Sequence, residues 1–460
     1  MSLIKSISGI RGTIGGKVDE NLTPIDAVKF AAAYGSWLKG QSSKEHVKVV
    51  IGRDARISGE MIQNLVQYTL IGLGIDVVNI GLSTTPTVEV AVPMEKADGG
   101  IILTASHNPK EWNALKLLNN KGEFVSDQDG KAILKIAQEN DFSFATVDHL
   151  GKLTDYNRYI DLHIEKVLAL PLVTAEAIQK KKFRVVVDAV NSTGGIAIPR
   201  LLERLGVEVV KLYCEPNGHF PHNPEPLKEH LGDICKRVVE EKADFGIVVD
   251  PDVDRLAFIT DQGEMFGEEY TLVACADYVL GKAKGNVVSN LSSSRALRDI
   301  AQKHGVSYSA AAVGEVNVVT EMKRVEAIIG GEGNGGIIYP ELHYGRDALV
   351  GVALFLSLLA ERGGSVQQLR ESYPAYFMSK NKIQLTEQIN PDQILKAMEQ
   401  KYAHEQTTTI DGLKIDFADS WVHLRKSNTE PIIRIYTEAK SQKEADALAH
   451  RFIEEMQALI

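Results

Sequence analysis

A short segment carrying a hydroxyl, an imidazole and an amide side by side is the first place where this sequence could do chemistry. It reads Thr104-Ala105-Ser106-His107-Asn108-Pro109 and follows the apolar run 100–103, which is typical of a buried strand. Proline disfavours helix in the residue before it, so the chain is expected to turn at Asn108. Ends of strands are where α/β folds place reactive groups. Ser106 is therefore a candidate nucleophile that needs activation, although the segment taken alone fits a simple Ser/Asn turn better.

Three aspartates at alternating positions form the second candidate site. Asp250, Asp252 and Asp254 come directly after the apolar segment 245–249, and Arg255 follows them. Such close carboxylates repel one another unless a cation binds them, and all-oxygen ligation favours a hard ion such as Mg²⁺. An EF-hand would need glycine where Arg255 stands, and a haloacid-dehalogenase-type nucleophile would want Thr or Val in place of Asp254. A solvated acidic turn does not suit so apolar a strand, so a metal site is the preferred interpretation.

A glycine-rich loop could bind the hydroxyl groups of a substrate. The loop 330–336 contains Glu332 and Asn334, and no helical pattern follows it, which argues against a dinucleotide-binding loop. A carboxylate and an amide on a flexible loop suit sugar hydroxyls. From this segment alone, a tight turn explains the glycines equally well.

Two basic segments could bind phosphate. Near the N-terminus, Arg11 stands between Gly9 and Gly12, and the rigid fork of arginine suits a phosphate, although a surface arginine in a turn is commoner. A second, donor-rich segment lies near the C-terminus and suits a phosphate dianion. Its candidate residues are Arg425, Ser427, Asn428, Thr429 and, on the following strand, Arg434. An exposed basic hairpin is the alternative, and the absence of a Gly-Lys-Ser/Thr run excludes a P-loop.

A strand, a helix closed by glycine and a second strand follow one another three times along the chain. The strands that open the three copies are expected at 47–51, 184–187 and 286–288. Units of this kind predict a mostly parallel sheet with right-handed crossovers. We therefore expect three related mixed-sheet α/β domains rather than one long doubly wound sheet.

The last part of the chain has a different pattern. Strands are expected at 421–424 and 432–436, and a closing helix from about 442 carries apolar residues at helical spacing. This pattern predicts a small α+β domain. The four domains are expected to span residues 1–155, 156–260, 261–372 and 373–460.

Composition excludes several classes of protein. The formal net charge of -10 disfavours general binding to nucleic acid or to anionic membranes. The cysteines Cys214, Cys235 and Cys275 lie far apart, without a CxxC pair, which fits a reduced cytosol. The N-terminus lacks the apolar core of a signal peptide, and the apolar segment 349–360 is too short to span a bilayer. A cytoplasmic protein without a nucleic-acid or membrane partner is expected.

Taken in this order, the candidate loops resemble those of the α-D-phosphohexomutases, the phosphoglucomutase/phosphomannomutase superfamily. Segment 106–109 resembles the phosphoserine loop of the family, 250–255 its metal loop, 332–336 its sugar loop and 425–429 its phosphate loop. The match covers essentially the whole chain. The resemblance implies four domains around a central cleft, the first three sharing one α/β fold. It also implies an isomerase that interconverts a hexose 6-phosphate and its 1-phosphate.

The resemblance gives each candidate residue a role. Ser106 would carry the phosphoryl group and pass it to the sugar, and the resulting bisphosphosugar would also be the activator that phosphorylates Ser106. Mg²⁺ would be held by the three aspartates and the seryl phosphate. Arg11 and Lys116 would stabilise and deprotonate at the transfer site, with the pKa of Lys116 lowered by a cationic pocket, and His107 would orient Ser106. The implied substrate-binding residues are Arg255, Glu332, Asn334, Arg425, Ser427, Asn428, Thr429 and Arg434.

Two departures from the family pattern affect these expectations. The usual histidine of the sugar loop is absent, so His343 or Arg346 nearby would have to serve. The family segment Asn-Gly-x-Lys appears as Asn113-Ala114-Leu115-Lys116, which keeps the lysine without the glycine. The loop Gly-Asn-Gly-Gly resembles those of phosphoglucosamine mutases and of dual phosphogluco/phosphomannomutases.

Phosphoglucosamine mutase is therefore the preferred activity and phosphoglucomutase/phosphomannomutase the alternative. A bisphosphosugar synthase, a serine-dependent sugar phosphatase and a non-catalytic sugar-phosphate sensor are more remote. The enzyme is expected to act as a monomer or homodimer on a small sugar phosphate.

Overall fold

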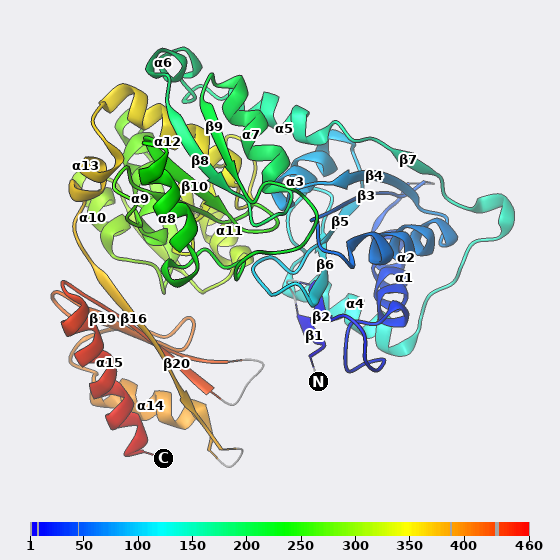
Figure 1. Ribbon diagram of the computed structural model, residues 1–460. Coiled ribbons are helices and arrows are strands. Elements are labelled where there is room, and N and C mark those ends of the chain that lie inside the picture. The colour runs from blue at the N-terminus through cyan, green and yellow to red at the C-terminus, as the bar shows by residue number, and fades with distance from the viewer. Residues whose placement is uncertain (1, 7–8, 45, 387–388, 428–431, 460) are drawn as a thin grey trace.

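The computed structural model describes residues 2–6, 9–44, 46–386, 389–427 and 432–459, which form four sheets. Figure 1 shows the first sheet in blue and cyan, the next two in green and yellow, and the last, in orange and red, set beside the others. No helix in these ranges is both long and apolar enough to cross a membrane.

The first sheet is mixed, with the strand order β1-β2-β6-β5-β3-β4-β7. Its strands are β1 (Ile4–Ser6), β2 (Gly9–Thr13), β3 (Lys48–Arg53), β4 (Asp76–Leu82), β5 (Gly99–Leu103), β6 (Trp112–Leu118) and β7 (Leu153–Asp155). The apolar side chains of α1 (Pro24–Gln41), α2 (Gly59–Gly72) and α4 (Asp127–Glu139) cover one face, and those of α3 (Thr85–Met94) cover the other. Thr84 is the N-cap of helix α3, and its Oγ1 accepts the amide N–H of Thr87 at 3.1 Å.

The second and third sheets have four strands each, in the orders β11-β10-β8-β9 and β13-β12-β14-β15. The second unit contains α5 (Tyr159–Leu168), α6 (Ala175–Lys181), β8 (Arg184–Asp188), α7 (Gly194–Arg204), β9 (Glu208–Leu212), α8 (Gly232–Glu240), β10 (Phe245–Val249) and β11 (Leu256–Ile259). The third contains α9 (Glu268–Lys282), β12 (Asn286–Asn290), α10 (Ala296–Lys303), β13 (Tyr308–Ala311), α11 (Glu315–Arg324), β14 (Ala327–Glu332), β15 (Gly336–Ile338), α12 (Ala348–Arg362) and α13 (Val366–Glu371). Short 3₁₀ helices span Val147–His149 and Lys228–His230.

The three units share one topology. In each, three parallel strands are followed by an antiparallel fourth, which is β6 in the first unit, β11 in the second and β15 in the third. The loop before this fourth strand carries the serine segment in the first unit, the aspartates in the second and the glycine-rich segment in the third. Three related mixed-sheet domains are thereby confirmed, and a single long doubly wound sheet is excluded.

The second and third units are joined by one apolar core. It runs from Ile160 to Tyr373 and contains almost every side chain of α12. Phe355 of α12 stacks on Phe258 of β11 with ring centroids 3.8 Å apart. The segment 349–360, predicted to be a buried helix, lies inside α12.

The C-terminal sheet is antiparallel, with the order β16-β20-β19-β18-β17, which confirms the α+β domain. It consists of β16 (Phe377–Gln384), β17 (Gln406–Thr408), β18 (Leu413–Asp416), β19 (Trp421–Lys426) and β20 (Ile432–Ala439), together with α14 (Pro391–Lys401) and α15 (Gln442–Gln457). Its contact with the third unit is polar. Arg295 donates to the carbonyl oxygens of Phe417, Ala418 and Ser420 at 2.9–3.1 Å.

Candidate active site

Ser106 lies in the turn between β5 and β6 and is held in an unusual conformation. Its φ of 50° falls in the left-handed region, which L residues rarely adopt. The amide N–H donates to Oγ1 of Thr104 at 2.9 Å, and the carbonyl oxygen accepts from Nη2 of Arg56 at 2.5 Å. Such a conformation costs roughly 1–3 kcal/mol and persists only where its surroundings fix it. The backbone that carries the hydroxyl of Ser106 is therefore held in one conformation.

Arg56, which sequence analysis missed, supports the serine turn from behind. Its fully buried side chain pairs with Asp54 through Nε and Oδ2 at 2.9 Å, and Asp54 also accepts from Oγ1 of Thr104 at 2.7 Å. The two Nη atoms donate at 2.5–2.9 Å to the carbonyl oxygens of Ser106, Asn108, Pro109 and Trp112. A signal was available, because Asp54-Ala55-Arg56 follows directly after β3, the neighbour of β5.

The aspartate loop after β10 meets the serine turn. Asp250, Asp252 and Asp254 are fully buried, and one oxygen atom of each lies within 4.8 Å of the others. Oδ1 of Asp250 accepts the amide N–H groups of Asp254 and Arg255 at 3.2 and 3.1 Å, which curls the loop around this carboxylate. Oδ2 of Asp250 accepts the hydroxyl of Ser106 at 2.8 Å. The predicted nucleophile and the predicted metal ligands are thus in direct contact.

The aspartate loop has the chemistry of a cation site. Oδ1 of Asp252 and Oδ1 of Asp254 are buried and have no hydrogen-bond partner among the described residues. Burial and the neighbouring carboxylates Asp252 and Asp254 raise the pKa of Asp250 well above its ordinary value. Buried carboxylates so close together require compensating positive charge, and oxygen ligands suit a hard divalent ion. The residues therefore fit a bound divalent metal ion.

Lys116, on β6, supplies part of this positive charge. Its Nζ lies 2.7 Å from Oδ2 of Asp252 and 3.5 Å from Oδ2 of Asp254. Burial acts to lower the pKa of Lys116, but the two carboxylates outweigh it and the pKa is raised. The predicted lowering of this pKa is wrong here, because the lysine faces carboxylates rather than cations. Thr85, at the start of α3, also donates to Oδ2 of Asp252, at 2.6 Å.

His107 and Arg11 flank the serine. Nδ1 of His107 lies 3.4 Å from Oγ of Ser106. Burial, together with the cations Arg255 and Arg11, lowers the pKa of His107 to about 2, so the imidazole is neutral at neutral pH. Nη1 of Arg11 donates to Oδ1 of Asn108 at 3.0 Å, which ties β2 to the serine turn. Arg11 therefore lies at the same turn as the candidate nucleophile.

The glycine-rich loop of the third unit packs directly on the aspartate loop. Gly335 has a φ of 85°, and a Cβ on it would lie 2.2 Å from the carbonyl oxygen of Leu256, so only glycine fits. The amide N–H of Leu256 donates to the carbonyl of Gly335 at 3.1 Å. Glu332 is buried at the end of β14, and Oδ1 of Asn334 accepts the amide of Gly336 at 3.2 Å.

Arg346 links the two loops. Its Nη2 lies 2.7 Å from Oδ2 of Asp254, its Nη1 3.1 Å from Oε2 of Glu332 and its Nε 2.9 Å from Oε2 of Glu315. Burial opposes the charge, but these carboxylates raise the pKa of Arg346 well above its ordinary value. Arg346, one of the two residues considered as a replacement for the missing sugar-loop histidine, therefore lies in this site and remains positively charged. His343 lies 3.4 Å from Glu89 of α3, in a different cluster.

The predicted phosphate segment belongs to the C-terminal sheet, which lies beside the other three sheets (Figure 1). Arg425 of β19 and Arg434 of β20 are cross-strand neighbours, and Nε of Arg425 lies 2.8 Å from Oδ2 of Asp411. The amide of Ser427 donates to the carbonyl of Ile432 at 3.0 Å. Asn428 and Thr429 lie outside the described residues. Arg255 pairs with Glu225 at 3.2 Å on the second unit.

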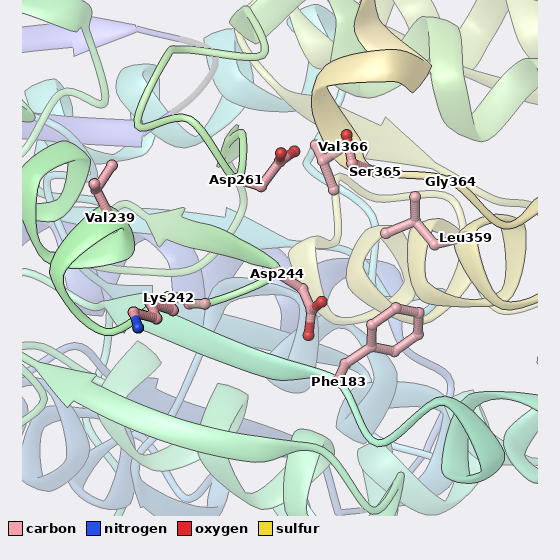
Figure 2. A pocket seen from close by; sticks show the side chains of 10 residues that line it. Phe183, Val239, Lys242, Asp244, Asp261, Leu359, Gly364, Ser365 and Val366 are labelled. Atoms are coloured by element: carbon pink, nitrogen blue, oxygen red, sulfur yellow. The ribbon is translucent and has the colours of Figure 1, made fainter.

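A separate cavity of about 490 Å³ lies near the start of β8 and the end of α12. Figure 2 shows Phe183, Asp244, Asp261 and Val366 around it. None of its described lining residues is a predicted site residue. The converging chemistry of this protein therefore lies at the loops before β6, β11 and β15, away from this cavity.

The repeated fold, and the contact of Ser106 with Asp250, one of three clustered buried carboxylates, are those of an intramolecular phosphotransferase, an isomerase. The chain belongs to the phosphoglucomutase/phosphomannomutase family and is a phosphohexomutase. Models of the three α/β/α domains of this family match residues 3–144, 158–263 and 267–376, and that of its C-terminal domain matches residues 382–455.

Individual relatives cover nearly the whole chain. A phosphoglucomutase/phosphomannomutase from Thermococcus kodakarensis is 36% identical over 94% of this chain and 95% of its own length. A probable phosphoglucosamine mutase from Methanopyrus kandleri is 32% identical over 97% and 96%. The crystal structure of a phosphoglucomutase/phosphomannomutase family protein from Burkholderia thailandensis has a TM-score of 0.86 at 25% identity, covering 99% of this chain and 98% of its own.

Proposed function

We propose that this phosphohexomutase interconverts glucosamine 6-phosphate and glucosamine 1-phosphate through a phosphorylated Ser106. The contact of 2.8 Å between Oγ of Ser106 and Asp250 carries the proposal, because it sets a hydroxyl against a candidate cation site. Relatives 32% and 33% identical are named probable phosphoglucosamine mutase. The second candidate is phosphoglucomutase/phosphomannomutase, which is favoured by the name of a relative 36% identical.

Two transfers complete one turnover in this proposal. The bond between phosphorus and Oγ of phosphorylated Ser106 breaks while a bond forms from phosphorus to the free hydroxyl oxygen of the sugar phosphate. The proton of that hydroxyl ends on Oγ of Ser106, and the sugar becomes a bisphosphosugar. This intermediate turns over in a central cleft. Its other phosphoryl group then passes to Ser106, which regenerates the phosphoenzyme and releases the isomeric sugar phosphate. A bisphosphosugar is also the activator that first phosphorylates Ser106.

The residues around Ser106 bind and orient in this scheme. Asp250, Asp252 and Asp254, with the seryl phosphate, hold Mg²⁺, which when bound neutralises charge on the transferring group. Arg11 approaches the phosphate from the side of Asn108. Lys116 acts as a cation, because Asp252 and Asp254 raise its pKa. His107, neutral at a pKa of about 2, orients the hydroxyl rather than accepting its proton.

The remaining residues hold the rest of the sugar phosphate. We assign the ring hydroxyls to Glu332 and Asn334, and one face of the substrate to Arg255. Because the intermediate must present either end to Ser106, the distal phosphate needs a site that accepts both orientations. That site is assigned to Arg425, Ser427, Asn428, Thr429 and Arg434.

Initial rates with three substrates test the proposal. Glucosamine 6-phosphate, glucose 1-phosphate and mannose 1-phosphate are compared with Mg²⁺ and a trace of bisphosphosugar. Ser106→Ala should be inactive, and Ser126→Ala, at an exposed helix cap, should be fully active. Preference for the glucose and mannose phosphates would establish the second candidate. Release of inorganic phosphate, or no isomerisation of any sugar, would refute a mutase.

The broader organisation is also proposed. The domains are taken as residues 1–155, 156–260, 261–372 and 373–460, and the enzyme as a cytoplasmic monomer or homodimer. Limited proteolysis followed by mass determination tests the boundaries. Sedimentation analysis of the intact chain tests the oligomeric state.

A further inference from the structure

Two histidines and an aspartate meet where the first three units join. Nε2 of His163, on α5, lies 2.9 Å from Oδ2 of Asp347, and Nε2 of His343 lies 3.2 Å from the same oxygen. One ligand atom from each of these residues lies within 4.8 Å of the others. The side chains of His163, Asp347 and His343 are 0%, 1% and 11% exposed. We call these three residues the histidine cluster.

Each histidine also has an oxygen atom near its other ring nitrogen. Nδ1 of His163 lies 3.0 Å from Oγ1 of Thr87, and Nδ1 of His343 lies 3.4 Å from Oε2 of Glu89. Glu89 is 1% exposed, and neither of its oxygen atoms has a hydrogen-bond partner in the described part of the chain. A buried carboxylate without partners is costly. This carboxylate can therefore accept a hydrogen bond from Nδ1 of His343 when that nitrogen carries the proton.

We propose that His163, His343 and Asp347 bind one Zn²⁺-type transition-metal ion through the two Nε2 atoms and Oδ2. Ligand atoms around a tetrahedral zinc ion lie roughly 3.3 Å apart, close to the 2.9 and 3.2 Å found here. One ligand atom of each of the three residues lies within 4.8 Å of the others, so all three can approach one ion. Nitrogen ligands select such an ion over Mg²⁺. A water molecule completes the coordination.

Metal binding would also give Thr87 and Glu89 hydrogen bonds from the second nitrogen of each imidazole ring. With Nε2 bound to the ion, each ring carries its proton on Nδ1, so His163 donates to Thr87 and His343 donates to Glu89. An imidazole ligand whose second nitrogen donates to a carboxylate is the usual arrangement in zinc sites. Gly345 fits this packing, because a Cβ there would lie 1.9 Å from Oε2 of Glu89.

The proposed ion would fix the first three units relative to one another. Glu89 and Thr87 come from α3, His163 from α5, and His343 and Asp347 from the segment leading into α12. Thr85, one helical turn before Glu89, contacts Asp252. An ion that fixes α3 would therefore also fix the contact between Thr85 and Asp252, although the histidine cluster shares no residue with the aspartate loop.

Titration of metal-free protein tests this site separately from catalysis. Excess Mg²⁺ is added first to occupy the aspartate loop, and Co²⁺ is then titrated while the visible absorption of four-coordinate Co²⁺ is followed. Zn²⁺ stoichiometry is measured by equilibrium dialysis. We expect one Zn²⁺ per chain, at least a hundredfold weaker binding in His343→Gln, and about tenfold to hundredfold weaker binding in Glu89→Gln.

Two variants serve as controls. His222→Gln removes another His–Asp pair, 3.0 Å from Asp188, and should bind Zn²⁺ as the wild type does. Asp252→Asn should also leave this binding unchanged. If His343→Gln does not fold, Asp347→Asn replaces it, because its amide oxygen can still cap α12 at Leu349. Equal affinity in wild type and His343→Gln, loss confined to Asp252→Asn, or no Zn²⁺ binding at all would overturn the proposal.

Discussion

Replacing Arg56 by lysine tests whether the activity depends on the hydrogen bonds that hold the serine turn in place. The lysine keeps the positive charge beside Asp54, so the buried ion pair survives. Its ammonium group has three donors, of which one is used by Asp54, whereas Arg56 serves four carbonyl oxygens in addition to that pair. At least two carbonyl oxygens would lose the hydrogen bond from this side chain. At about 1–3 kcal/mol each, the loss of stability is about 2–6 kcal/mol.

The turn that loses this support carries Ser106 at a φ of 50°. We expect the serine to move by a fraction of an ångström to an ångström, and a shift of 1 Å costs about a hundredfold in rate. The urea midpoint measures stability, and initial rates give kcat and KM. We expect kcat to fall by about tenfold to a hundredfold and KM to stay nearly constant, because Arg56 lies behind the turn.

Arg53→Lys is the matched control. Arg53 lies three residues earlier and donates to Gln63 at 2.8 Å and to the carbonyl of Asp54 at 3.2 Å, without contacting the serine turn. It should lose some stability and keep its kcat. Wild-type kcat in a folded Arg56→Lys enzyme would refute the positioning role, as would a change confined to KM.

Three further outcomes are expected. Asp252→Asn should lose at least a hundredfold in kcat with its circular dichroism unchanged, and full activity in Mg²⁺ would contradict the metal assignment. Arg425→Ala should raise KM far more than it lowers kcat or the urea midpoint. Lys426→Ala, which removes an Nζ that pairs with Asp392, should leave KM and kcat unchanged. Unchanged kinetics of Arg425→Ala would remove that residue from the phosphate site. Burial lowers the pKa of His423 to about 4, against about 6.5 in an unfolded chain. The contribution of neutral His423 to the free energy of unfolding is therefore complete above pH 6.5. It is lost as the pH falls to about 4, by about 1.4 kcal/mol per pH unit. His423→Gln should lack this part of the pH dependence of the urea midpoint, and identical slopes would contradict the expectation.

The sequence predicted the fold because the repeated strand–helix–strand pattern is local. Buried parallel strands contain continuous apolar runs, such as 185–187 within β8, and glycines end the intervening helices, so both features are visible without any tertiary contact. The strand order within each unit, and the pairing of β2 with β6, depend on contacts between distant segments. Those could not be derived from periodicity.

The sequence pointed to residues that the structure brings together, such as Ser106 and Asp250, but it did not predict their electrostatics. Ser106 and the aspartates were recognised because their residue types and spacing are unusual. The raised pKa of Lys116 was missed, since it depends on which charge lies closest to Nζ, and that is Asp252 on another unit. Arg56 was missed because its role is to satisfy backbone carbonyls, and a single sequence does not mark which carbonyls lack a partner.

The second and third units match two family domains, but the apolar core that they share makes them one cooperative folding unit. The family models divide the chain between residues 263 and 267, yet Phe258 and Phe355 stack across that division. Either half expressed alone would expose one side of this stack, together with much of α12. Recombination between homologous genes at this boundary should therefore yield insoluble products unless both halves come from one parent. The two units have to change together during evolution, whereas the C-terminal sheet meets the third unit through polar contacts such as those of Arg295, so its own apolar core can change independently of theirs.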